Sequence, residues 1–151
     1  MADIDSTRDG NNPLVRGMSS LTCLIAGGIF IIVAIWGFFL PEGGYVLGLF
    51  AVNAMHNWVH LLSGLILLAA GFSDNRSAAI ALCVFGVIYG LVTIMGFAGV
   101  PWVVNMLNLN HADHWLHLLL TAAFLVVGIT DLSSKPGTTR SAYGKIGRAH
   151  V

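Results

Sequence analysis

Charge is what this sequence lacks. The 151-residue chain has seven Lys and Arg and seven Asp and Glu, so 9% of its residues are charged, against about 25% in soluble domains. Such a chain cannot form an ordinary water-exposed surface, which excludes a nucleic-acid binder, a disordered protein and a typical soluble enzyme. With 56% hydrophobic residues, the composition indicates an integral membrane protein. Between Leu21 and Thr130 the charged side chains are Glu42, Asp74, Arg76 and Asp113.

Apolar runs of membrane-spanning length make up most of the chain. A helix needs about 20 apolar residues to cross the hydrocarbon core of a bilayer. The fold class is therefore all-α: a polytopic membrane protein with four transmembrane helices in a domain that covers residues 21–130. A polar segment, 1–20, precedes this domain, and a tail, 131–145, follows it. The expected spans are 21–40, 53–71, 78–97 and 110–128.

Basic residues indicate the orientation of the spans. Lys and Arg occur in the N-terminal segment, in the turn 73–77 and in the C-terminal tail, but not in the loops 41–52 and 98–109. Because cytoplasmic segments are enriched in Lys and Arg, we expect both termini to be cytoplasmic. Residues 146–151, Ile-Gly-Arg-Ala-His-Val, match a translated sequencing adapter, and we expect them to be an artefact.

The chain also repeats itself. A shift of 57 residues aligns the second span with the fourth, and a shift of 59 aligns the first with the third. This pattern predicts two tandem two-helix hairpins related by a pseudo-twofold axis along the membrane normal. We expect Asn53 and Asn110 to be helix N-caps, and we expect Gly71 and Gly128 to lie just past helix ends. The shared landmarks include Asn53 and Asn110, Trp58 and Trp115, His60 and His117, Gly71 and Gly128, Gly27 and Gly86, and Gly37 and Gly96.

Polar side chains form one stripe on each of the second and fourth spans. Residues three or four apart share a face of a helix, and polar groups within a span should face the bundle interior. We therefore expect the two stripes to face each other or a shared cavity. They consist of Asn53, His56, Asn57, His60 and Gly64, with Ser63 nearby, and of Asn110, Asp113, His114, His117 and Thr121.

Three interpretations of these stripes are open. The favoured one is a structural network of hydrogen bonds that includes the polar residues Asn53, Asn57, Ser63, Asn110 and Thr121. The second is a transition-metal site formed by His56, His60, His114 and His117, with Asp113 as a ligand or as an orienting group. A variant of it is a haem b with His60 and His117 as axial ligands, for which Gly64 would leave room. The third is the transport of protons or small solutes.

Other functional assignments are limited. No residue is assigned a catalytic role, and an enzyme is not favoured, because no established catalytic or metal-binding motif such as HExxH is present. The lipid bilayer is the expected partner, nucleic acid is not, and a homo-oligomer stays open.

Two runs carry a resemblance to a known family. Residues 47–61, with the motif Asn-Ala-Met-His-Asn-Trp-Val-His, and residues 112–118, Ala-Asp-His-Trp-Leu-His-Leu, resemble a family of small bacterial four-span membrane proteins. The resemblance covers about residues 17–130, and the family is known as a domain of unknown function. It implies a protein of the bacterial cytoplasmic membrane but supplies no reaction, cofactor or partner.

Overall fold

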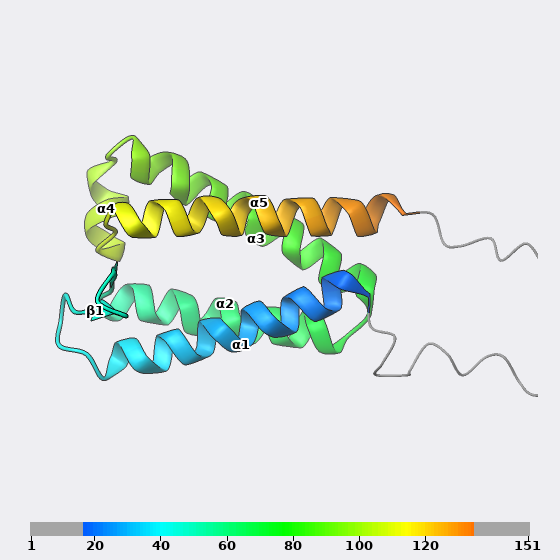
Figure 1. Ribbon diagram of the computed structural model, residues 1–151, viewed down its shortest axis with the longest axis horizontal. Coiled ribbons are helices and arrows are strands. Elements are labelled where there is room, and N and C mark those ends of the chain that lie inside the picture. Colours follow the sequence, from blue (N-terminus) through cyan, green and yellow to red (C-terminus); the bar gives the residue numbers. More distant parts are fainter. Residues whose placement is uncertain (1–16, 135–151) are drawn as a thin grey trace, which may run out of the picture.

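Four long helices form the computed structural model, which describes residues 17–134 (Figure 1). Each of the four has 19 to 23 residues and is apolar enough to cross a membrane. The all-α polytopic membrane fold is therefore confirmed. The expectations for residues 1–16 and 135–151, including the adapter-derived end, lie outside the described residues. The elements are α1 (Met18–Phe38), β1 (Tyr45–Val46), β2 (Phe50–Ala51), α2 (Ala54–Phe72), α3 (Asn75–Phe97), α4 (Pro101–Leu107) and α5 (His111–Ser133).

The helices run along the long axis of the molecule, α1 against α2 and α3 against α5 (Figure 1). α1 begins and α5 ends at the same end of the bundle, where the turn between α2 and α3 also lies. We call this the terminal end. The short strands β1 and β2 and the helix α4 cover the opposite end, which we call the hairpin end.

Asparagine side chains begin two of the spans, as the sequence predicts. The Asn53 side-chain oxygen accepts a hydrogen bond from the backbone N–H of His56 at 2.9 Å. Asn110 accepts one from the N–H of Asp113 at 3.0 Å, and the Asp113 carboxylate accepts one from the N–H of Asn110 at 2.8 Å. This reciprocal pair is a capping box, which satisfies backbone donors at the start of α5.

Two glycines do not end helices, so that expectation is wrong. Gly71 lies inside α2, and α5 continues beyond Gly128 to Ser133. A Cβ atom on Gly71 would lie 3.0 Å from the backbone nitrogen of Leu24, and one on Gly128 would lie 2.8 Å from the carbonyl oxygen of Ala79. Both glycines therefore allow the backbones of neighbouring helices to approach closely, a common role of small residues in membrane bundles.

The packing repeats with the sequence, which confirms the internal repeat. Contacts between α1 and α2 recur between α3 and α5 at positions shifted by 59 residues in the first helix and 57 in the second. Small residues and aromatic pairs both follow this rule. The matched contacts are Gly27 with Leu68 and Gly86 with Leu125, Gly37 with Asn57 and Gly96 with His114, and Phe38 with Trp58 and Phe97 with Trp115.

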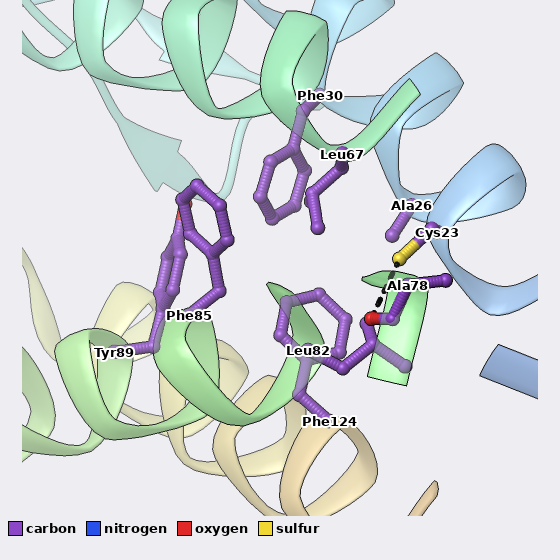
Figure 2. Close-up of a cluster of buried hydrophobic side chains, with 9 residues drawn as sticks. All are labelled: Cys23, Ala26, Phe30, Leu67, Ala78, Leu82, Phe85, Tyr89 and Phe124. Atoms are coloured by element: carbon purple, nitrogen blue, oxygen red, sulfur yellow. Dashed lines mark hydrogen bonds between the residues drawn. The ribbon is translucent and has the colours of Figure 1, made fainter. Parts of the chain in front are cut away.

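The main hydrophobic core lies between the two hairpins (Figure 2). It joins α1 and α2 of one hairpin to α3 and α5 of the other. The Cys23 thiol belongs to this core and donates a hydrogen bond to the carbonyl oxygen of Ala78 at 3.5 Å. Phe30 and Tyr89 extend from the core toward the polar stripes. The members are Cys23, Ala26, Phe30, Leu67, Ala78, Leu82, Phe85, Tyr89 and Phe124.

The two connections at the hairpin end contain secondary structure. β1 pairs with β2 in an antiparallel ribbon in which Tyr45 lies opposite Ala51. The connection 98–109, expected as a loop, contains α4. This helix begins at Pro101, which suits a first helical position because its missing N–H has no partner there. It ends at Leu107 and is capped by Asn108, whose φ of 52° places it in the left-handed region.

Asparagine side chains join these two connections to each other. Asn53 donates to the carbonyl oxygen of Met106 at 3.0 Å, across from the first connection to the second. Asn108 and Asn110 donate in the other direction, to the carbonyl oxygens of Val52 at 3.2 Å and of Leu49 at 2.7 Å. The connections thus form one cover over the hairpin end of the bundle.

Candidate metal centre

Three histidines converge in the half of the bundle nearer the hairpin end. His56 and His60 lie one turn apart on α2, and His117 lies on α5. Each offers a ring nitrogen, and these three nitrogens lie within 4.8 Å of one another. All three side chains are buried, with at most 7% of their surface exposed. We call this group the histidine triad. It is the only group of three or more potential metal ligands within residues 17–134.

The backbone orients the first ring of the triad. Nδ1 of His56 lies 3.1 Å from the carbonyl oxygen of Ala51, which is in β2. Because a carbonyl can only accept, Nδ1 carries the proton and Nε2 of the neutral ring presents a lone pair. Nε2 of His60 lies 2.9 Å from that lone pair. A carbonyl that fixes one ring N–H is the usual arrangement for a metal-ligating histidine, and here the other nitrogen of His56 is hydrogen-bonded to His60.

Aromatic rings enclose the triad symmetrically. The Phe30 ring packs edge-on against His60, with 5.1 Å between ring centroids, and Tyr89 packs in the same way against His117 at 5.2 Å. Phe30 and Tyr89 are 59 residues apart, so they are equivalent positions of the repeat. His60 and His117 are therefore equivalent positions with equivalent aromatic neighbours. His56 is the third member of the triad, and the first hairpin alone has a histidine at that position.

A cavity of about 40 Å³ adjoins the triad. A water molecule needs on the order of 10–15 Å³ by this measure, so the cavity has room for an ion or a few waters. Val59 and Ile88, on its outer side, are 37% and 47% exposed on the surface that would face lipid. The cavity is lined by His56, Val59, His60, Ser63, Ile88, Tyr89, Val92, Leu107 and His117.

Residues 20–130, which carry the four long helices and the triad, match the sequence family DUF4383, described as a domain of unknown function. The chain belongs to the DUF4383 family. The match confirms the resemblance to a family of unknown function, and it brings no activity, cofactor or partner with it. No curated protein and no solved structure matches this chain. The function of this DUF4383 member must therefore be argued from its own geometry.

The structure leaves His114 outside the triad. The ring of His114 packs against α3 at Gly96 and lies 5.3 Å from the ring of Phe97. Asn57, its equivalent in the first hairpin, packs against Gly37 of α1 in the same way. In this DUF4383 chain these two positions therefore serve the contact between the helices of each hairpin. Of the four histidines considered from the sequence, the structure brings three together.

The remaining stripe residues lie around the triad. Asp113 is buried, and its carboxylate is used by the capping box of α5. Asn53 and Asn110 cap helices and hold the cover of the hairpin end. Thr121 donates to the carbonyl oxygen of His117 one turn earlier at 2.8 Å. Ser63 is the one residue of the expected polar network that lines the cavity.

A haem does not fit this arrangement. Gly64 was expected to leave room for the macrocycle, but α1 occupies that space: a Cβ atom on Gly64 would lie 2.8 Å from the carbonyl oxygen of Gly27 and 3.1 Å from the nitrogen of Ile31. The cavity of about 40 Å³ is also far smaller than a porphyrin. The space beside the triad suits a single ion.

Two contributors were missed by the sequence reasoning. No role was assigned to Tyr89 from the sequence, although the shift of 59 residues aligns it with Phe30 and the shift of 57 aligns His60 with His117. The repeat could therefore have suggested that Tyr89 lies beside the fourth span's histidine. The carbonyl oxygen of Ala51 has no such signal, because any residue supplies a carbonyl and only the fold decides where it points.

Proposed function

We propose that this chain is an integral membrane protein that binds a transition-metal ion through His56, His60 and His117. The convergence of three buried imidazoles within 4.8 Å carries the proposal. Metal–nitrogen bonds of about 2.0–2.1 Å place tetrahedral ligand nitrogens roughly 3.3 Å apart. The 2.9 Å between His56 and His60 is close to this value. Because the three nitrogens lie within 4.8 Å of one another, binding would require them to approach by at most about 1.5 Å.

A purely structural hydrogen-bonded network explains the triad less well. Buried polar groups in native structures nearly always have hydrogen-bond partners. Nδ1 of His60 and Nδ1 of His117 are buried without a partner in the described part of the chain, and so is Nδ1 of His114 outside the triad, so hydrogen bonds leave these rings incompletely satisfied. The hydrogen bonds within the triad also join only His56 to His60, so they do not connect α2 to α5. An ion shared by the three rings would make that connection.

The orientation of the protein in the membrane is part of the proposal. Arg76 lies in the first turn of α3, at the terminal end. The connections at the hairpin end contain no Lys or Arg. The distribution of basic residues supports a cytoplasmic terminal end and an extracytoplasmic hairpin end. The bacterial cytoplasmic membrane is what the family resemblance implies. The triad would then lie nearer the extracytoplasmic side.

Metal analysis of the purified protein tests the binding proposal. The protein is purified in detergent, incubated with Zn(II), Cu(II), Ni(II) or, under anaerobic conditions, Cu(I) in turn, desalted and analysed by inductively coupled plasma mass spectrometry. We expect about one ion per chain for at least one metal, and loss of that ion in His60→Ala and in His117→Ala. His114→Ala is the matched control, since it removes a buried histidine of the same helix from outside the triad.

Two outcomes would overturn the proposal. One is that no metal stays bound to the wild-type protein under any of these conditions. The other is that His114→Ala loses the ion to the same extent as His117→Ala, which would show that binding does not depend on the triad. Circular dichroism of each variant checks that the helices are retained.

A further inference from the structure

We infer that the ion of the histidine triad is monovalent copper, Cu(I), held by the three imidazoles without a fourth protein ligand. This inference rests on the proposed function and names the ion that the site would take. It follows from the charge, the number and the surroundings of the ligands. Each of these is visible in the residues around His56, His60 and His117.

The ligand set carries no negative charge. A neutral imidazole leaves the full charge of the ion uncompensated, and the cost of burying an ion rises with the square of its charge. A divalent ion here would therefore cost about four times as much as a monovalent one. Divalent sites with three protein ligands either include a carboxylate, as in His₂Glu zinc sites, or hold a water or hydroxide on the ion, as in His₃ zinc sites.

The one carboxylate near the triad is used elsewhere. The repeat places Asp113 at the position equivalent to His56, so a symmetric site would contain it. Instead its carboxylate oxygen accepts the backbone N–H of Asn110 at 2.8 Å, within the capping box. The chain therefore offers the ion three neutral donors and keeps the acid at the helix terminus.

The surroundings also favour a three-coordinate ion. Aliphatic side chains, Val59, Ile88 and Val92, form the cavity wall between α2 and α3. They offer nothing to stabilise a bound anion such as hydroxide, which a divalent ion would need. Imidazole is a suitable ligand for copper. Cu(I) is monovalent and has a filled d shell, so three neutral nitrogen donors can hold it without a bound hydroxide. The hydroxyls of Ser63 and Tyr89 are the lining groups that could hold a hydroxide, and they define the competing outcome.

The test uses the full-length protein in detergent under anaerobic conditions. It is titrated with Cu(I) in competition with a chromophoric Cu(I) chelator, and separately with Zn(II). We expect one Cu(I) per chain that is not displaced by excess Zn(II). His117→Gln should weaken Cu(I) binding by more than about 100-fold, since loss of a direct ligand should exceed the loss of an orienting group. His114→Gln should leave binding unchanged.

X-ray absorption at the copper edge of the wild-type protein gives a second readout that does not depend on any variant folding. We expect the edge feature of three-coordinate Cu(I) and scattering from imidazole nitrogen alone. A site that binds Zn(II) and not Cu(I), or that binds copper with four or more ligands, would refute the inference while the proposed metal binding stands. A protein that binds neither of these ions, and none of the ions in the metal analysis above, would refute the proposed function itself.

Discussion

Two adjacent glycines on α1 provide the sharpest test of the packing. A Cβ atom on Gly27 would lie 2.8 Å from the carbonyl oxygen of Gly64 and 2.9 Å from the backbone nitrogen of Leu68, whereas one on Gly28 would meet nothing within 4 Å. Alanine adds the same methyl group and the same gain in helix propensity, about 1 kcal/mol, at both positions. Only at Gly27 must the backbones of α1 and α2 move apart, at a cost of about 1–3 kcal/mol.

We therefore expect Gly28→Ala to raise the free energy of unfolding by about 1 kcal/mol. The free energy of unfolding of Gly27→Ala should be lower than that of Gly28→Ala by about 1–3 kcal/mol. The assay is reversible unfolding in mixed detergent micelles with increasing sodium dodecyl sulfate, followed by circular dichroism. Gly86→Ala, the repeat equivalent of Gly27, should be milder, because its nearest neighbour at 2.7 Å is the movable Leu125 side chain. Equal stability of Gly27→Ala and Gly28→Ala would refute the close approach of α1 and α2.

Three further predictions concern the helix ends and the orientation. Asn110→Ala should lower the free energy of unfolding by about 1 kcal/mol through loss of the α5 cap; an unchanged value in the same micelle assay would contradict the capping box. Hydrogen bonds from the Ser77 side chain and backbone lower the pKa of Asp74 from 3.8 to about 2. A lowered pKa means that the contribution of the charged Asp74 to stability is complete above pH 4 and is lost as the pH falls toward 2. The difference in unfolding free energy between the wild type and Asp74→Asn should therefore shrink over that range. A constant difference would argue against this role of the Asp74 carboxylate. An impermeant maleimide should label Glu42→Cys in intact cells and Arg76→Cys only after lysis; the reverse pattern would invert the proposed orientation.

The sequence sufficed for the spans because their signal is local. Runs of about 20 apolar residues predict helices without knowledge of their neighbours. The N-caps at Asn53 and Asn110 are also local, since the side chain bonds to a backbone three residues away. Gly71 and Gly128 were misjudged because a glycine near the end of an apolar run suits both a helix end and a close approach. Only the neighbouring helix decides between these roles, and its position is not a local property.

The sequence predicted that the histidines face the bundle interior, but not which of them meet. The stripes on α2 and α5 correctly placed their histidines in the bundle interior, where His56, His60, His114 and His117 are all buried. Which of them meet depends on the rotation of each helix about its axis. Successive residues of a helix point about 100° apart, so residues three apart point about 60° apart. The rotation that brings His117 to the centre therefore carries His114 toward α3. The contact of His114 with Gly96 fixes that rotation, and this contact involves a different helix from the one that carries the stripe.

The two halves of the repeat differ at the positions of His56 and Asp113. This difference distinguishes the proposed binding site from a simple duplication of the packing. His60 and His117 lie against Phe30 and Tyr89 as equivalents, so the repeat alone yields two facing imidazoles. Two nitrogen donors are too few to hold an ion firmly. The first hairpin adds His56 and orients it with the carbonyl of Ala51, while the second has Asp113 at that position and uses it to cap its helix. In the proposed site, this one difference would supply the third ligand and, at the same time, keep negative charge away from the ion.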